Sequence, residues 1–167
     1  MGKVIPFKGC KGGTSMSIHC TDVAKAFLSF KPLTHKQLQK LCYYAQAWSL
    51  VLFDKPLMNV DFEAWIHGPV CPELYKYYQG YGYEEIPQES HMPKSIENNA
   101  EICELIRQVF RIYGHLDGDQ LEELTHSERP WQLARGNKKP WEPSNEVIDP
   151  NIMKEYYMAE LRDDMDV

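Results

Sequence analysis

The sequence has no long apolar run and no Cys-x-x-Cys pair, and these absences exclude two classes of protein. No stretch approaches the roughly 18 apolar residues that suggest a membrane span, and the lysine-containing start has no apolar signal core. The five cysteines, at positions 10, 20, 42, 71 and 103, are odd in number and widely spaced. This pattern favours reduced thiols over a disulfide framework. We therefore expect a cytoplasmic protein that does not contact a membrane.

Motifs for binding metals and phosphates are also missing. The Gly80-x-Gly82 pair lacks the Gly-Lys-Ser/Thr end and the following helix of a phosphate loop. Metal-ligand spacing is absent around the histidines considered, which are His19 beside Cys20, His115 and His126. We expect no metal and no cofactor.

The pair His67 and Cys71 is the one arrangement that suggests covalent chemistry. A thiol nucleophile needs a base within hydrogen-bonding reach and an oxyanion site. The chain offers no third member at a recognisable position, and prolines at 69 and 72 remove backbone donors. We prefer structural packing for this pair and expect no catalytic residue. A Cys/His hydrolase stays the weakest alternative.

Acidic residues are almost absent from the first 40 positions, where seven lysines accompany Asp22 alone. This part has a net charge of +6, and the remainder has −12, which makes duplex DNA a poor partner for most of the surface. We interpret residues 1–20 as a flexible basic leader and residues 21–167 as a single helical domain, because 167 residues fit one core. Nucleic acid is not an expected partner, and the sequence predicts no oligomeric state.

The strongest local pattern begins at Thr34, where Thr-His-Lys-Gln forms a capping box with Gln37. Apolar residues then recur at steps of three and four through Trp48, which predicts a helix over about 34–53. Apolar and aromatic residues also cover its neighbouring faces. A helix of this kind lies at the centre of a core.

A second long helix is predicted over about 95–113, with Ser95 as its cap and Gly114 as its end. The two long helices should pack together. This predicts a mainly α fold, a single-domain helical bundle with at most a short two-stranded β element. The expected buried contact residues are Leu41, Ala45, Trp48, Ile102, Ile106 and Val109.

Shorter elements complete the expected fold. A strand within 60–66 should pair with another at 146–148. Proline, glycine and polar residues predict surface loops at 83–94 and 137–145. Capping residues and apolar spacing predict short helices at about 21–29, 72–79, from 117, 130–136 and from 150.

Residues 62–75 combine glycine, prolines and aromatic residues into a turn between two helical patterns. Gly68 allows unusual backbone angles, Pro69 restricts them, and Pro72 suits the first position of a helix. We expect a rigid corner that fixes Trp65 and His67. With Trp48 and Pro72, these residues should support the fold. For His67 we prefer a hydrogen-bonded core histidine to a direct binding role.

The helix after Pro72 carries more tyrosines than one buried face can accommodate. Tyrosine combines apolar area with a polar tip and is enriched in protein interfaces. We expect some of this set to bind a protein partner, and the candidates are Tyr75, Tyr77 and Tyr81.

Several ordered blocks of the chain resemble the Panacea domain, the SocA-like antitoxin family of bacteria, phages and other mobile elements, whose members are often described only as phage-associated. The blocks extend from Val-Ala-Lys-Ala-Phe-Leu at 23–28 to Pro-Trp at 130–131. Between them are Leu-Gln-Lys-Leu-Cys-Tyr-Tyr-Ala-Gln-Ala-Trp at 38–48, Lys-Pro-Leu at 55–57, Glu-Ala-Trp-Ile-His-Gly-Pro-Val at 63–70, Pro-Glu-Leu-Tyr at 72–75 and Leu-Thr-His at 124–126.

The resemblance implies a mainly helical, non-enzymatic antitoxin, encoded beside a toxin that it blocks by direct binding. It identifies neither the toxin nor a catalytic residue. Two other functions share parts of this interpretation. One is an adaptor that delivers a bound protein to a protease. The other is a DNA-binding regulator, which needs a recognition helix rich in arginine or lysine, and Lys36 and Lys40 are the residues that come nearest to this requirement.

Overall fold

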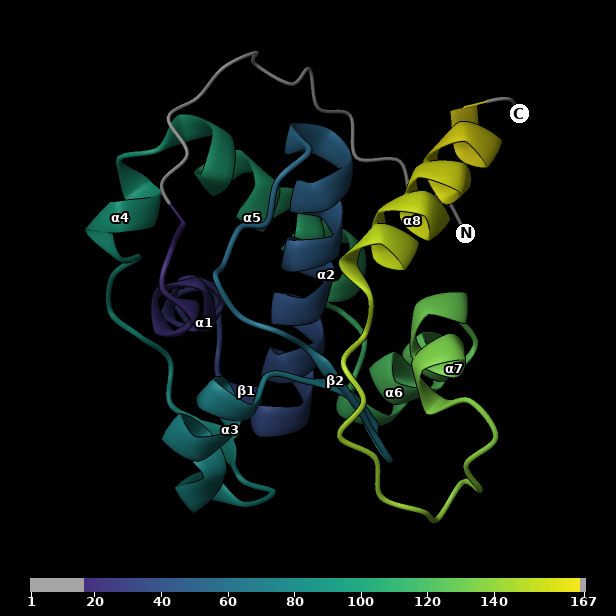
Figure 1. Cartoon of the computed structure of the whole chain (residues 1–167). Helices are drawn as coiled ribbons and strands as arrows, with labels where there is room; N and C mark the ends of the chain where they lie inside the picture. Colours follow the sequence, from purple (N-terminus) through teal and green to yellow (C-terminus); the bar gives the residue numbers. More distant parts are fainter. Residues whose placement is uncertain (1–16, 166–167) are drawn as a thin grey trace.

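Helix α2 (His35–Phe53) lies at the centre of the fold in the computed structural model, which describes residues 17–165 (Figure 1). The capping box is present as predicted, because the Gln37 amide donates to the Thr34 hydroxyl and the Thr34 amide donates to Gln37 Oε1, at 3.2 and 2.9 Å. Asp54 ends the helix with a φ of +57°. Side chains are buried around most of the circumference of α2. This is why neighbouring helices pack on it from several directions.

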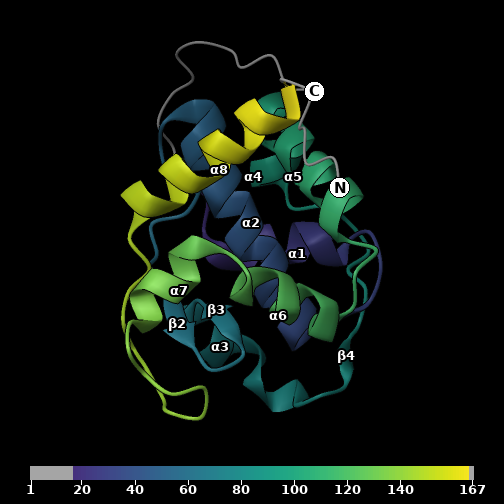
Figure 2. The ribbon, with the colours of Figure 1, turned by 90° about the vertical axis from the view of Figure 1, so that its right-hand side faces the viewer.

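Residues 17–165 contain eight α-helices, which confirms the mainly α prediction. Helices α1, α5, α6 and α8 contact α2 directly. Figure 2 shows that α6, α7 and α8 lie along the same side of the molecule. The helices around α2 are α1 (Cys20–Leu28), α3 (Pro72–Tyr78), α4 (Lys94–Glu97), α5 (Ala100–Tyr113), α6 (Gly118–His126), α7 (Arg129–Arg135) and α8 (Pro150–Met165), with a 3₁₀ turn η1 (Gln79–Tyr81) after α3.

The helix predicted over 95–113 is two helices in the structure. Helix α4 ends at Asn98, and Asn99 begins α5 by accepting a hydrogen bond from the Ile102 amide at 3.2 Å. Asparagine favours such caps because its side chain competes for backbone hydrogen bonds. Ser95 is not the cap, and its hydroxyl donates to Asp22 at 2.8 Å. Helix α5 packs on α2 as expected, but Ile102 is only half-buried.

Two small antiparallel sheets replace the single β element that the sequence suggested. Strand β1 (Leu33–Thr34) pairs with β4 (Glu85–Ile86), which lies inside the expected loop over 83–94. Strand β2 (Glu63–Trp65) pairs with β3 (Gly68–Val70), and the predicted strand at 146–148 contributes one bridge, between Glu63 and Val147. The corner is therefore a tight hairpin. The sequence did not reveal β3 because its glycine and proline are poor strand formers.

A polar network of aromatic residues joins the central helices inside the core. The hydroxyl groups of Tyr44 on α2 and Tyr157 on α8 both donate to the buried carboxylate of Glu128, each at 2.8 Å. The Trp48 indole on α2 donates to the Tyr113 hydroxyl on α5 at 2.9 Å. The rings of Tyr44 and Tyr113 stack with their centroids 3.9 Å apart. These contacts fix how α5 and α8 sit on α2.

The described residues begin within the expected leader. Residues 1–16 lie outside them, whereas Ile18 and Cys20 are buried, so the packed part of the chain begins before residue 21. None of the helices within 17–165 is both long and apolar enough to cross a membrane. The described cysteines, at positions 20, 42, 71 and 103, are free thiols.

Candidate functional site

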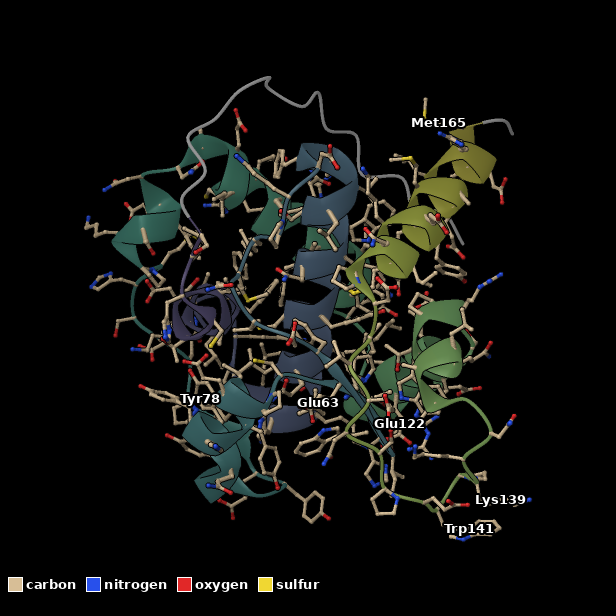
Figure 3. The ribbon with its side chains drawn as sticks, in the orientation of Figure 1. Glu63, Tyr78, Glu122, Lys139, Trp141 and Met165 are labelled. Carbon is tan, nitrogen blue, oxygen red and sulfur yellow. The ribbon has the colours of Figure 1, made fainter. Side chains whose placement is uncertain are left out.

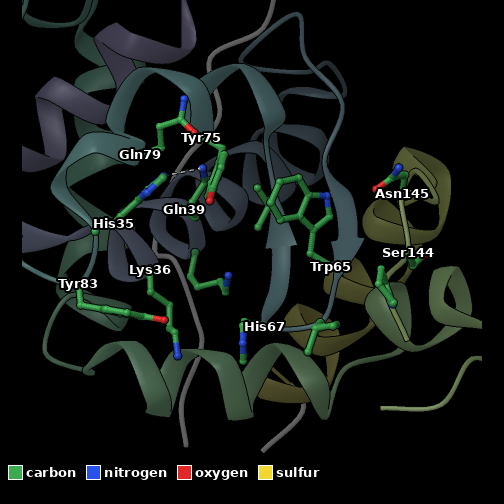
Figure 4. A pocket seen from close by; sticks show the side chains of 15 residues that line it. His35, Lys36, Gln39, Trp65, His67, Tyr75, Gln79, Tyr83, Ser144 and Asn145 are labelled. Atoms are coloured by element: carbon green, nitrogen blue, oxygen red, sulfur yellow. Dashed lines mark hydrogen bonds between the residues drawn. The ribbon is translucent and has the colours of Figure 1, made fainter. Parts of the chain in front are cut away.

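A cavity of about 620 Å³ lies between α2, the β2–β3 hairpin, α3 and the loop that precedes α8 (Figure 4). Its walls combine aromatic rings with basic side chains. Six of the lining residues carry most of its chemistry: His35, Lys40, Trp65, His67, Tyr75 and Tyr83. Pockets of this composition, apolar with a few polar groups, are common binding sites.

The hairpin wall packs too closely on α2 to accept a larger residue at Gly68. This glycine has a φ of +110°, and a Cβ atom added to it would lie 2.6 Å from Cε of Lys40 and 2.9 Å from Oγ1 of Thr125. The Lys40 ammonium donates to the Pro69 carbonyl at 3.1 Å. Gly68 and Pro69 thus bring the hairpin backbone onto a lysine of the central helix.

Lys40 is 1% exposed and is the most unusual charged group of the cavity. Burial lowers the pKa of Lys40 to about 7, a change that Glu122 opposes and Lys36 increases. An acceptor or carboxylate that enters the cavity would favour the charged ammonium. At neutral pH Lys40 is therefore only partly charged, and its charged form has no carboxylate partner among the ion pairs of the described residues.

Glu122 of α6 connects the two basic residues at the rim. Its Oε1 accepts from the Lys36 ammonium at 2.8 Å and lies 3.1 Å from Nδ1 of His67. Lys36 also donates to Asp119 at 3.0 Å. Figure 4 shows both basic side chains pointing toward the helix below them, and Figure 3 places Glu122 beside the hairpin.

His67 is therefore not the core histidine that we expected. Its side chain is 70% exposed, because it occupies the two-residue tip between Trp65 and Gly68 in the hairpin. The tip directs the imidazole away from the core, toward Glu122. The structure also separates His67 from Cys71, since the Cys71 thiol is buried and hydrogen-bonded to Cys20.

His35 and Tyr75 form the wall opposite the rim. Burial, followed by the nearby Lys40 charge, lowers the pKa of His35 to about 4, so its ring is neutral at physiological pH. The Gln39 amide nitrogen lies 3.1 Å from Nε2 of His35, the contact dashed in Figure 4. The Tyr75 ring stacks on His35 at 5.1 Å and meets the Trp65 ring at 5.0 Å. Helix α3 is thereby held against α2.

The exposed tyrosines divide into two groups. Tyr75 and Tyr83 line the cavity, with Tyr83 fully exposed. Tyr77 and Tyr81 are 56% and 41% exposed and do not line it. Tyr77 instead lies beside Lys25 of α1, with the ammonium 5.9 Å from the ring centroid.

Sequence reasoning missed His35, Gln39 and Lys40 as cavity residues. The sequence did contain a signal that Lys40 is buried. Lys40 belongs to a helix that is apolar around most of its circumference, so little of the helix surface remains exposed to solvent for a charged side chain. Ser144 and Asn145 of the expected loop also line the cavity. Trp141 of this loop is 72% exposed and projects outward, as Figure 3 shows.

Comparisons with known proteins agree with the resemblance found in the sequence. The family model described as "Antitoxin SocA-like, Panacea domain" matches residues 38–132, which include the hairpin and most of the cavity. Antitoxin SocA of Caulobacter vibrioides (strain NA1000 / CB15N) is 32% identical over 112 residues, which cover 61% of this chain and 60% of the relative. The chain thus matches less than two thirds of that protein's length. No solved structure is significantly similar. Because the family model covers more than half of its residues, the chain belongs to the SocA-like antitoxin family of the Panacea domain.

Proposed function

We propose that the protein is a cytoplasmic, non-enzymatic antitoxin that neutralises a cognate toxin by binding it directly. Membership of the SocA-like family carries this proposal. The positions of His67 and Cys71 support the non-enzymatic part, because the exposed imidazole is paired with Glu122 and the buried thiol with Cys20. The toxin is occluded at its active or target-binding surface.

We place the binding surface at the cavity and the tyrosines around it. Tyr75, Tyr77 and Tyr81 are all exposed, and Tyr83 extends this aromatic surface to the cavity mouth. Large amphipathic side chains contribute much of the binding energy in protein interfaces. The corner residues Trp65, Gly68, Pro69 and Pro72, with Trp48 in the core, maintain the fold that presents this surface.

The charge of the cavity indicates which group of the toxin enters it. Lys36, Lys40 and His67 line the cavity. Glu122 pairs with Lys36 and His67 at the rim, so Lys40 is the basic group there without a carboxylate partner among the ion pairs of the described residues. An acidic side chain or a chain-terminal carboxylate of the toxin would gain charge-assisted hydrogen bonds there. The chain as a whole is acidic, with a net charge of −6, which suits basic regions of a partner outside the cavity.

Alanine substitution of the tyrosines tests this surface. Tyr75→Ala and Tyr83→Ala alter the cavity, and Tyr77→Ala and Tyr81→Ala alter the neighbouring surface. Each loss of a dominant contact should weaken toxin binding by roughly 30-fold or more. The melting temperature should change little for Tyr77→Ala, Tyr81→Ala and Tyr83→Ala, whereas Tyr75→Ala should also lower it, because the Tyr75 ring packs on His35 and Trp65. Rescue from the toxin encoded beside the gene, together with thermal melting, measures both effects.

The exposed Leu133 on α7 provides a matched control, because Leu133→Ala removes apolar surface away from the cavity. This variant should rescue as well as the unchanged protein. If all four tyrosine variants rescue fully, the toxin binds elsewhere. Toxin lifetime in cells with and without their proteases separates occlusion from a protease adaptor, since occlusion leaves that lifetime unchanged.

A further inference from the structure

The starts of α1 and α3 meet at a cluster of potential metal ligands. His19 and Cys20 begin α1, and Glu73 lies in the first turn of α3. One ligand atom from each of these residues lies within 4.8 Å of the other two. His19 Nε2 lies 3.3 Å from Glu73 Oε1.

The separation between His19 and Glu73 fits a tetrahedral zinc site. Zinc binds imidazole nitrogen and carboxylate oxygen at about 2.0–2.2 Å and thiolate sulfur at about 2.3 Å, so neighbouring ligand atoms are about 3.3–3.8 Å apart. The observed distance between His19 and Glu73 is at the lower end of this range.

Cys71 lies beside Cys20, outside the cluster of His19, Cys20 and Glu73, and is the candidate for a fourth donor. Both residues are 1% exposed, and their thiols are hydrogen-bonded to each other. The Gln39 side chain fixes the Cys71 backbone, because its Oε1 accepts from the Cys71 amide at 2.9 Å and its Nε2 donates to the Cys71 carbonyl at 3.3 Å. The second thiol is thus held in place by the central helix.

The histidine is also oriented for metal binding. The Thr21 amide donates to its Nδ1 at 3.2 Å, and the Thr21 hydroxyl oxygen lies 2.7 Å from the same atom, so the ring is held with Nε2 3.3 Å from Glu73 Oε1. Zinc binding at Nε2 would move the ring proton to Nδ1, where the Thr21 hydroxyl oxygen can accept it, as partners of metal-bound histidines usually do. The Ile18 amide donates to the Leu57 carbonyl at 2.8 Å and fixes the chain just before the site.

We propose that His19, Cys20, Cys71 and Glu73 bind one zinc ion. Two thiolates, an imidazole and a carboxylate favour zinc over the hard cations magnesium and calcium. Binding replaces the thiol protons, so up to two protons are released to solvent for each ion bound. The ion joins the start of α1 to the start of α3, the helix that carries Tyr75 and Tyr77. This site is separate from the toxin-binding surface and goes beyond the proposed function.

Zinc titration of the tag-free, metal-free full chain under a thiol reductant tests the site. Competition with a chromophoric chelator should give one zinc per chain. At a hundredfold excess of free zinc over the dissociation constant, the melting temperature should rise by roughly 5–10 °C. Cobalt in place of zinc should give a thiolate-to-metal charge-transfer band.

Substitution of the ligands distinguishes this site from adventitious binding. Glu73→Gln and His19→Ala alter exposed side chains and should fold, and each should weaken zinc binding by at least about 10-fold. Cys20→Ser and Cys71→Ser should weaken it further and abolish the cobalt band, whereas Cys103→Ser is the matched control and should leave binding unchanged. Less than one zinc per chain, or binding that survives Glu73→Gln and His19→Ala, would overturn the proposal.

Discussion

Replacing Lys40 with methionine should reduce the pH dependence of the stability of the fold. The Lys40 ammonium is buried on α2 and donates to the Pro69 carbonyl. Burial lowers the pKa of Lys40 from its ordinary value of 10.5 to about 7, with Glu122 opposing this change and Lys36 adding to it. Methionine has a similar length but does not titrate, so it removes the proton-linked contribution of the lysine.

The sign and size of the effect follow from linkage. Between pH 7 and pH 10.5 the unfolded chain binds more protons at residue 40 than the folded chain, so Lys40 makes the free energy of unfolding rise with pH. The slope approaches about 1.4 kcal/mol per pH unit, and the integrated rise between pH 7 and pH 9 is about 2 kcal/mol. Well below pH 7 the lysine is charged in both states, and the slope disappears.

Urea unfolding of the two proteins at pH 7, 8 and 9 measures this difference. Cys71, whose pKa is lowered to about 7 chiefly by the Cys20 hydrogen bond, titrates in the same range in both proteins, so its contribution cancels. Lys36→Met is the matched control. Burial alone would lower the pKa of Lys36, but hydrogen bonds to Glu122 and Asp119 raise it above the ordinary value, so this variant should keep the rise between pH 7 and 9. Equal slopes for the unchanged protein and Lys40→Met would refute the reasoning.

Three further substitutions test the packing by denaturant unfolding. Trp48→Ala should lower the free energy of unfolding by about 3–5 kcal/mol, because the ring is fully buried and its indole donates to Tyr113. A loss below about 1 kcal/mol would contradict the place of Trp48 in the core. Gly68→Ala should cost about 3 kcal/mol through the positive φ and the contact with Lys40, and toxin rescue should fall with stability. Tyr78→Phe should be neutral or stabilising, because this buried hydroxyl has no hydrogen-bond partner among the described residues; a large loss would reveal a missing partner.

Local signals in the sequence were sufficient for most of the helices. The Thr34 capping box and the apolar circumference of the following residues predicted α2 and its central place. Pro72 marked the start of α3, and Asp117 with Gln120 marked the start of α6. These signals succeed because capping and periodicity depend on residues only a few positions apart.

Features that depend on contacts distant in the chain were not predictable in this way. The positions of His19 and Cys20 in the sequence show no metal-ligand spacing. In the fold, however, Glu73 lies beside them although it belongs to another helix more than 50 positions away. The direction of His67 is set by pairing between β2 and β3, which the glycine and proline of β3 concealed. Lys40 became a cavity residue only because the hairpin folds onto α2.

Direct binding to a toxin can be measured with purified components. The protein should be mixed with the purified toxin encoded beside its gene, and both the complex and the toxin's activity should be measured without any protease present. We expect a stoichiometric complex with a dissociation constant below micromolar and loss of toxin activity in proportion to the complex formed. An active toxin that shows no complex at micromolar concentrations of both proteins would contradict it.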